Sequence, residues 1–379
     1  ILIECKGVIN IMEPIRVLQV VTIMNRGGLE TMLMNYYRKL DKSKIQFDFM
    51  TNRVERGHYD DEIEALGGKI YRLSPIKPGK YNKYFKELDN FFNEHKEYKV
   101  VHSHINENSG FVLKAAKKAG IECRIAHSHL SDLKLDYKYP FRVYARRNLK
   151  GNVSDYFACS KRAGEWLFGK DISNSGKVTV LNNAVDTEKF RFNEEVRNNI
   201  RRKLDIEGKK VIGHVGRFNP QKNHEFLIDV FNEIYKKDKD IVLLLVGDGY
   251  LKEKIEEKVN KLGLDKSVEF LGVREDIPEL MQAMDLFLFP SQFEGLAVVM
   301  VEAQAAGLKV ITSTGVTKES DITNNVEFID LSKGAEYWAD IVLNSDFKKR
   351  DDINLMVKKG YDSTNNVKWL SDFYLKKYV

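Results

Sequence analysis

Short runs of β-branched and aromatic residues alternate along the first half of the chain with longer amphipathic stretches. The apolar runs predict strands at Arg16–Val21, Gln46–Met50, Lys69–Leu73, Val100–His102, Arg124–Ala126, Tyr156–Ala158 and Val178–Leu181. Amphipathic stretches such as Gly28–Leu40 and Gly110–Ala119 fall between them and predict helices. Strands that alternate with helices are typical of a parallel sheet covered by helices on both faces.

The same alternation begins again near residue 190. The polar segment Phe190–Gly208 predicts a linker and a helix, and a further helix is expected at Asn223–Lys236. Strands are predicted at Val211–Val215, Ile241–Val246, Val268–Phe270, Leu286–Phe289, Val310–Thr312 and Val326–Ile329. The predicted fold class is α/β, with two doubly wound domains at residues 12–190 and 191–361. A cleft between two such domains is the expected ligand site, because parallel sheets bind ligands at the carboxyl ends of their strands.

Composition and charge agree with two folded domains. The chain has 379 residues, of which 43% are hydrophobic, enough to form two cores. The net charge of +6 is uneven, since residues 1–190 hold 32 Lys+Arg against 23 Asp+Glu and residues 191–379 hold 29 against 32. The basic first half suggests an anionic partner, either phospholipid or nucleic acid, or it is ordinary solubility charge.

The sequence shows no pattern typical of a disulfide framework, a membrane span or a signal peptide. Three widely spaced cysteines, Cys5, Cys123 and Cys159, form neither a disulfide framework nor a zinc pattern, which fits a reducing cytoplasm. No apolar run approaches the roughly 20 residues that span a bilayer. Residues 1–11 do not form a signal peptide, and Met12 resembles a natural start, so these residues are expected to be leader or added sequence.

The segment Pro290–Gly307, PSQFEGLAVVMVEAQAAG, carries the strongest chemical signal. A buried strand leads into a loop with Glu294, and Gly295 and Leu296 are expected to open a helix that contains Glu302. The unpaired N–H groups of a helix start suit an anionic diphosphate. Glu302 would lie about two turns into this helix, roughly 9 Å from its start. One carboxylate is then placed to hold sugar hydroxyls and the other ribose hydroxyls.

A second signal lies in Gly213–Phe231, GHVGRFNPQKNHEFLIDVF. Arg217 leaves the carboxyl end of a predicted strand, and Lys222 directly precedes the next helix. Two cations at a helix start suit a diphosphate. Asn223 follows the lysine and is expected to cap the helix.

Glycines and histidines mark strand ends in the first domain. Gly27 and Gly28 follow the first strand, where glycine lets the backbone approach an anionic ligand closely; they do not form a G-x-G-x-x-G pattern, so no nicotinamide cofactor is indicated. Four of the eight histidines follow two other strands, at His102, His104, His127 and His129. A polar structural network is the favoured interpretation over a metal site, since no acidic third ligand lies nearby.

Two further segments suggest other partners. Leu133–Gly151 interleaves aromatic with basic residues, which suits an anionic membrane or nucleic acid, and the membrane is favoured because no nucleic-acid motif accompanies it. The pair Asp238 and Asp240 formally makes a D-x-D, but it precedes a strand rather than following one. A solvated turn is therefore expected there, and no metal site is predicted.

Pro290–Gly307 resembles the E-x7-E signature of family 4 of the retaining glycosyltransferases, which have the GT-B fold of two Rossmann-like domains. The spacing of Arg217 and Lys222 is similar to that family's G-R-x-x-x-x-K pattern, although the family usually has Gly where this chain has Asn223. The resemblance extends over nearly the whole chain from Met12. By overall character the chain looks closest to bacterial enzymes of capsular and exopolysaccharide assembly.

The resemblance implies roles for individual residues. Arg217 and Lys222 would bind the donor diphosphate, and a histidine, either His127 or the favoured His129, would contact the transferred sugar. Backbone groups near Val273 would bind the base edge, and the loop at Gly27 and Gly28 would face the phosphates and the acceptor. A final helix near 362–379 would cross back onto the first domain.

The expected function is hexosyl transfer, with retention of configuration, from a nucleotide-diphosphate sugar, with UDP favoured, to a saccharide acceptor that is expected to be lipid-linked. The second domain is expected to bind the donor and the first the acceptor, without a metal, in the cytoplasm at the inner face of the plasma membrane. Two alternatives stay open: a sugar-nucleotide epimerase or hydrolase of the same fold, and a non-catalytic protein that binds anionic surfaces.

Overall fold

The computed structural model describes residues 13–77, 79–130 and 139–378, and it divides into two compact units. Unit 1 comprises Ile1–Val180 and Val367–Val379, and unit 2 comprises Leu181–Asn366. Residues 181–190, assigned to the first domain by pattern, thus group with unit 2, where Val185 forms a bridge with Asp362. The expected leader, residues 1–11, lies outside the described residues.

Unit 1 contains a seven-stranded parallel sheet in the order β3-β2-β1-β4-β5-β6-β7. Its strands are β1 (Ile15–Val21), β2 (Ile45–Thr51), β3 (Ile70–Arg72), β4 (Val100–Ser103), β5 (Cys123–Ser128), β6 (Asp155–Ala158) and β7 (Val178–Val180). Its helices are α1 (Gly28–Lys39), α2 (Asp60–Ala65), α3 (Tyr81–Glu94), η1 (Asn106–Asn108), α4 (Ser109–Lys118), α5 (Tyr139–Arg147), α6 (Lys161–Phe168) and α7 (Lys170–Asn174).

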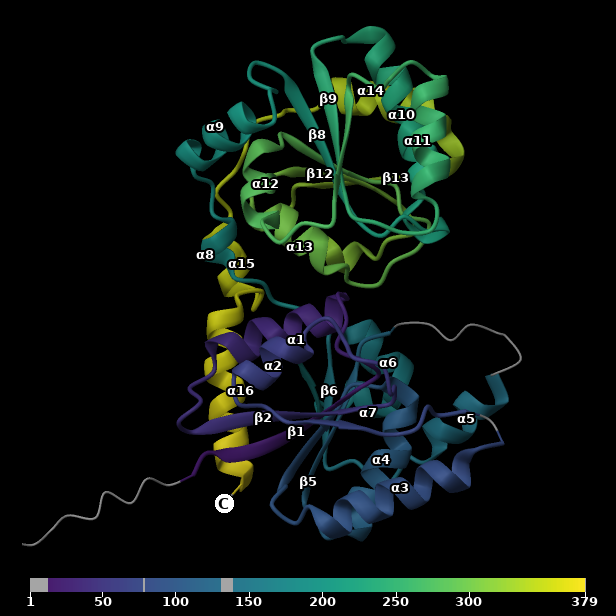
Figure 1. Ribbon diagram of the computed structural model, residues 1–379, viewed down its shortest axis with the longest axis vertical. Coiled ribbons are helices and arrows are strands. Elements are labelled where there is room, and N and C mark those ends of the chain that lie inside the picture. Colours follow the sequence, from purple (N-terminus) through teal and green to yellow (C-terminus); the bar gives the residue numbers. More distant parts are fainter. Residues whose placement is uncertain (1–12, 78, 131–138, 379) are drawn as a thin grey trace, which may run out of the picture. The chain divides into compact units, whose positions relative to one another are not determined.

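Helices cover both faces of this sheet. Figure 1 shows α1, α2 and α16 (Ser363–Tyr378) on one face and α3, α4 and α5 on the other. Because successive strand residues point to opposite faces, Leu18 and Val20 of β1 join the apolar core under α3 and α4, whereas Gln19 points to the α16 face, where it contacts Tyr374. Residues from Val367 onward, which carry most of α16, group with unit 1.

Unit 2 contains a six-stranded parallel sheet in the order β10-β9-β8-β11-β12-β13. Its strands are β8 (Lys210–Val215), β9 (Ile241–Val246), β10 (Val268–Gly272), β11 (Leu286–Phe289), β12 (Lys309–Ser313) and β13 (Val326–Ile329). Its helices are α8 (Thr187–Phe190), α9 (Glu194–Lys203), η2 (Pro220–Lys222), α10 (His224–Lys237), α11 (Lys252–Lys261), α12 (Ile277–Ala283), α13 (Val298–Ala305), η3 (Lys318–Ser320), η4 (Leu331–Lys333), α14 (Gly334–Leu343) and α15 (Ile353–Lys358).

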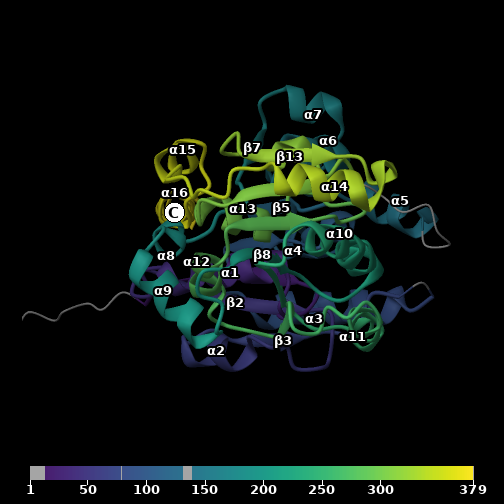
Figure 2. The ribbon, with the colours of Figure 1, turned by 90° about the horizontal axis from the view of Figure 1, so that it is seen from above.

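Two apolar clusters lie on the two faces of the unit 2 sheet. One packs α12 and α13 against it, and the other packs α10, α11 and α14, an arrangement visible in Figures 1 and 2. The central strands are buried on both faces, which is why β9 reads as the continuous apolar run IVLLLV. The predicted α/β class with two doubly wound parallel sheets is confirmed.

Across the described residues, no helix combines the length and the apolarity that crossing a bilayer requires.

Candidate active site

The loop after β8 carries the two predicted diphosphate cations. Arg217 is exposed, and its guanidinium has no polar partner among the described residues. Asn219 then accepts a hydrogen bond from the backbone N–H of Lys222 at 3.1 Å, which starts the short helix η2. This turn holds Lys222 just before α10, as the sequence predicts.

Asn223 does not cap α10 in the way the sequence suggested. It adopts the left-handed conformation, with φ 57° and ψ 44°, and its side chain makes no cap hydrogen bond; instead its amide donates to the carbonyl of Pro290 at 3.2 Å. Asparagine is among the few residues besides glycine that tolerate this conformation. The backbone shape, rather than capping, therefore explains why Asn stands where the resembling family has Gly.

Glu294 and Lys222 lie together although 72 positions separate them. Glu294 follows β11, and its Oε1 lies 2.6 Å from Lys222 Nζ. The hydroxyl of Ser291 donates to the same oxygen at 3.1 Å, and Lys222 Nζ lies 4.5 Å from the centre of the Phe289 ring. Both charged side chains are largely buried, with 16% and 13% of their surface exposed. The pair thus forms a charged centre at the carboxyl end of the sheet.

The helix after Glu294 begins later than predicted. Gly295 and Leu296 do not open it, because α13 starts at Val298, with Ala297 as an uncapped N-terminal residue. Glu302 consequently lies about 6 Å along the helix rather than 9 Å. Among the described residues, the backbone N–H groups of Gly295 and Leu296 have no hydrogen-bond acceptor. These two N–H groups can still bind an anion, but they belong to the loop before α13 and not to its first turn.

Glu302 differs in surroundings from Glu294. Its carboxylate has no hydrogen-bond or ion-pair partner within the described part of the chain, and burial raises its pKa from 4.5 to about 7. A partly buried carboxylate without a partner is costly for the folded state, so a ligand with hydroxyl donors would suit it.

Two glycines that the sequence analysis missed shape this end of the sheet. Gly247, after β9, has φ 135°, and a Cβ there would lie 2.2 Å from the carbonyl oxygen of Gly216. A Cβ on Gly249 would lie 2.5 Å from the carbonyl oxygen of Phe218. The run Gly247–Gly249 after a buried strand was the available signal, since only glycine allows so close an approach at positive φ.

Val273 and the pair Gly27 and Gly28 follow strands, as the sequence predicts. Val273 directly follows β10 and is 53% exposed. Gly27 precedes α1 in an extended conformation and Gly28 is its first residue. A Cβ on Gly27 would lie 2.3 Å from Glu30 Oε2, so the Glu30 carboxylate folds over this helix start. A phosphate at this position would have to displace that carboxylate.

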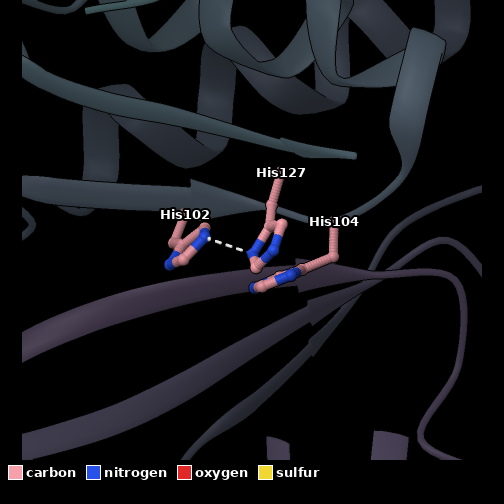
Figure 3. Close-up of side chains that lie close together, drawn as sticks. All are labelled: His102, His104 and His127. Carbon is pink, nitrogen blue, oxygen red and sulfur yellow. Dashed lines mark hydrogen bonds between the residues drawn. The ribbon is translucent and has the colours of Figure 1, made fainter. Parts of the chain in front are cut away.

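Four of the six histidines of unit 1, at 102, 104, 127 and 129, form one cluster in which the first three are buried and His129 is partly buried. His102 and His127 project from β4 and β5, while His104 and His129 are the first residues after those strands. Figure 3 shows the rings of His102, His104 and His127 turned toward one another, with ligand-capable nitrogens within 4.8 Å. Burial lowers the pKa of each of the four, and that of His129 falls to about 3.

This cluster has the geometry of a hydrogen-bond network rather than of a metal centre. Of the six ring nitrogens of His102, His104 and His127, only Nε2 of His127 has no partner in the described chain. The rings of His102 and His104 stack face to face, with centroids 4.2 Å apart and an interplanar angle of 25°, whereas two histidines that share a metal ion point the edges of their rings at it.

Two further segments of the sequence bear on other partners: the D-x-D at Asp238 and Asp240, and the basic aromatic segment Leu133–Gly151. Asp238 and Asp240 pair with Lys210 and Lys209 at 2.9 Å, which occupies both carboxylates in a turn before β9. Residues 131–138 of the segment Leu133–Gly151 lie outside the described residues. Its remainder forms α5, whose aromatic residues Tyr139, Phe141 and Tyr144 are 38%, 38% and 48% exposed.

Comparison with known proteins identifies the family. The description "Glycosyltransferase Family 4" matches residues 26–189, and "Glycosyl transferases group 1" matches residues 196–330. The chain is 37% identical over 95% of its length, and 96% of the relative's, to the EpsF protein of Bacillus subtilis (strain 168), which carries the name of a glycosyltransferase. It is 26% identical to the capsular polysaccharide biosynthesis glycosyltransferase CapH of Staphylococcus aureus, over 96% of this chain and 99% of that one.

Further likenesses agree. The chain is 27% identical, over 75% of its length and 76% of the relative's, to the UDP-Gal:alpha-D-GlcNAc-diphosphoundecaprenol alpha-1,3-galactosyltransferase of Escherichia coli. The crystal structure of Anabaena Alr3699/HepE in complex with UDP superposes with a TM-score of 0.77 at 18% identity, covering 95% of this chain and 100% of that one, which shows the shared fold. This chain therefore belongs to the group 1 and family 4 glycosyltransferases of the GT-B fold, enzymes that include those of capsule and exopolysaccharide biosynthesis.

Proposed function

We propose that this glycosyltransferase moves a hexosyl group from a UDP-sugar to a lipid-linked saccharide during assembly of a cell-surface polysaccharide. The observation that carries the proposal is the contact between Lys222 and Glu294 at the sheet edge; the loop that holds Lys222 also carries the exposed Arg217, five positions earlier. This contact brings together Lys222, the proposed ligand of the diphosphate, and Glu294, the proposed ligand of the sugar. The names of the Escherichia coli and Staphylococcus aureus relatives support a UDP donor, a lipid-linked acceptor and a polysaccharide product.

The proposed scheme assigns the donor to unit 2. Lys222 and Arg217 bind the diphosphate with the free N–H groups of Gly295 and Leu296, and Glu294 turns to the sugar hydroxyls. Glu302 accepts hydrogen bonds from the ribose, and backbone groups at Val273 bind the base. Cations aimed at the leaving diphosphate stabilise the charge that develops there, which is usually the largest catalytic contribution. No metal is required in this scheme.

The sugar leaves with retention of configuration in the same scheme. The leaving diphosphate oxygen takes the proton of the acceptor hydroxyl while the oxocarbenium-like sugar lies between them, so no protein nucleophile is needed. His129 contacts the transferred sugar. Unit 1 binds the acceptor, with the glycine loop at Gly27 and Gly28 on the acceptor side.

Unit 1 is also proposed to contact the anionic inner face of the plasma membrane, in the cytoplasm. The exposed aromatic residues of α5 lie beside the exposed cations Arg147 and Lys150, a combination that suits a charged lipid interface. Replacing Tyr144 by Ser and Arg147 by Glu is expected to weaken sedimentation with vesicles of phosphatidylglycerol. Lys44→Glu, on the loop before β2, is the charge-matched control; equal loss in both proteins would contradict the role of α5.

A panel of sugar nucleotides tests the donor assignment. We expect UDP and one UDP-sugar to raise the melting temperature of the full chain, and slow hydrolysis of that sugar without an acceptor. Protection by GDP-sugars alone would overturn the choice of base. Rapid release of free sugar or an epimer, with no transfer to any lipid-linked saccharide, would favour a hydrolase or epimerase instead.

A further inference from the structure

A continuous hydrogen-bond network links the four clustered histidines to Gln19 of β1 and Tyr374 of α16. All six side chains belong to unit 1, and β1 and β4 place Gln19 and His102 side by side in register. Gln19, His102, His104, His127 and Tyr374 are at most 2% exposed. Because burial lowers the histidine pKa values, each ring is neutral and carries one N–H and one acceptor nitrogen. If one nitrogen of a ring donates, the other must accept, so the direction of each hydrogen bond fixes the direction of the next one along the network.

The first arm of the network runs from Gln19 to His129. His104 Nε2 lies 2.9 Å from Gln19 Oε1 and donates to it. The other nitrogen of His104, Nδ1, must then be the acceptor, and it lies 3.0 Å from His129 Nε2, which donates. His129 Nδ1 is left as a buried acceptor without a partner among the described residues.

The second arm runs from Gln19 to His127. Gln19 Nε2 donates to the Tyr374 hydroxyl at 3.3 Å, and that hydroxyl donates to His102 Nδ1 at 2.6 Å. His102 Nε2 then donates to His127 Nδ1 at 3.1 Å. This arm ends at His127 Nε2, a buried N–H without a partner among the described residues.

Only one other arrangement pairs every atom along the network. If the Gln19 amide is turned over, every donor becomes an acceptor, and all four histidines carry the proton on Nδ1 instead of Nε2. The distances favour the first arrangement. In the reverse one, the Tyr374 hydroxyl would donate to the Gln19 oxygen at 3.3 Å, beyond the usual 2.5–3.0 Å of an O–H···O bond, and His102 would donate N–H to oxygen at an unusually short 2.6 Å.

We propose that Gln19 and Tyr374 are positioning residues that hold all four histidines as Nε2–H tautomers, so that His129 presents an unprotonated Nδ1. Native proteins leave few buried polar atoms unpaired, and the partner that this nitrogen lacks is a donor such as a hydroxyl. In the enzyme, that donor is a hydroxyl of the sugar, a step that rests on the proposed function. His129 thereby accepts a hydrogen bond from the sugar and gives it no proton.

Nuclear magnetic resonance of the full-length, 15N-labelled chain tests the tautomers without any donor. Long-range 1H–15N spectra at pH 7.5, assigned with single His→Gln variants, are expected to show His102, His104, His127 and His129 as Nε2–H tautomers. Nδ1–H forms, or averaged signals for His104 and His129, would overturn the proposal. Since no sugar nucleotide is present, this result is independent of whether the donor assignment holds.

Three variants separate the two arms. Gln19→Leu removes the anchor of both arms, and His104 and His129 are expected to lose their single tautomer. Gln19→Glu keeps the acceptor for His104, so it is expected to retain the His129 tautomer even if Gln19→Leu fails to fold. Tyr374→Phe is expected to alter His102 and His127 but to leave His129 unchanged. The matched control is Tyr84→Phe, whose buried hydroxyl has no partner among the described residues.

Activity completes the test. With UDP-glucose and the other UDP-sugars of the panel as probes, Gln19→Leu is expected to lower kcat about tenfold, the effect of losing one well-positioned hydrogen bond, with KM nearly unchanged. Gln19→Glu should recover most of this loss. Equal kcat values for Gln19→Leu and Tyr84→Phe, with the tautomer of His129 lost only in the former, would refute a role in positioning.

Discussion

Glu294 and Glu302 carry the same carboxyl group in opposite surroundings. Glu294 is balanced by Lys222 and Ser291, whereas Glu302 lacks a partner in the described chain and has a pKa raised to about 7 by burial. A group that destabilises the folded protein is commonly retained where the active site requires it. The two residues therefore respond differently to substitution.

Glu302→Gln is expected to stabilise the protein in a pH-dependent manner. The folded pKa of Glu302 lies above its usual 4.5, so its contribution to stability is lost as the pH rises toward 7. The variant should gain up to about 3 kcal/mol in free energy of unfolding at pH 8 and little at pH 4.5, measured by urea titration. Glu257→Gln, at an exposed position of α11, is the control, and an equal gain at both pH values would contradict the assignment.

Arg217→Ala and Lys222→Ala are each expected to lower turnover by on the order of 10²-fold or more, because each removes a cation from the leaving diphosphate. Lys222→Ala also leaves Glu294 without its ion pair, so melting temperatures must accompany the rates. Lys210→Ala, which removes an ion pair with Asp238 and a contact with the Phe347 ring, should retain normal turnover. Near-normal rates in both test variants would exclude the diphosphate assignment.

At the level of elements, α13 is fixed by one buried amide. Gln304 Oε1 accepts from the backbone N–H groups of Ile322 and Thr323 at 2.9 and 3.1 Å, and its Nε2 donates to the carbonyl of Ser320 at 2.8 Å. This side chain ties the helix that carries Glu302 to the loop after β12.

Gln304→Leu is expected to cost on the order of 3 kcal/mol, because it leaves buried backbone groups unpaired. The loss should appear in urea unfolding of the full chain, together with weaker sugar-nucleotide binding as α13 shifts. Gln292→Leu, at an exposed position of the same segment, should cost far less. Similar losses in both variants would show that the network of Gln304 is not what holds the helix.

Elements with strong local patterns were predictable from sequence. The bounds of β9, β11 and β13 coincide with the predicted runs. For β9 and β11 the reason is that a fully buried strand is a short, continuous apolar run. The start of α13 was missed, because Gly295–Ala297 form a turn that carries no capping signal. The motifs at Arg217, Lys222 and Glu294 were found, but the contact between Lys222 and Glu294 depends on strand order and leaves no local trace.

At the scale of the whole molecule, buried neutral histidines govern the response to acid. Burial lowers the pKa of His102, His104, His127, His129, His214 and His224. In the unfolded chain these rings take up protons near pH 6.5, and in the folded chain they do not. Stability is therefore complete above that pH and is lost as the pH falls below it.

The four clustered histidines, His102, His104, His127 and His129, should together give a slope of up to about 5 kcal/mol per pH unit below pH 6.5, since each missing proton contributes about 1.4 kcal/mol. Urea midpoints between pH 7.5 and 5 measure this slope. His104→Gln keeps a hydrogen-bonding side chain at the same place but cannot take up a proton. This variant should therefore reduce the slope by about 1.4 kcal/mol per pH unit, the contribution of one proton. A free energy of unfolding that stays constant from pH 6.5 to 5 would contradict the neutral network.

Tyr374 meets Gln19 across 355 positions of sequence, and it also packs against Phe47 of β2. A ribosome makes the strands of unit 1 first, and it makes α16, one of the helices on that face of the sheet, only after nearly the whole of unit 2. During translation, the part of the face that Tyr374 contacts, at Gln19 and Phe47, therefore lacks this cover while a second domain is synthesised and folds. The unit that is made first is completed last, so a nascent chain that stalls within α16 would carry a finished unit 2 and an open, aggregation-prone unit 1.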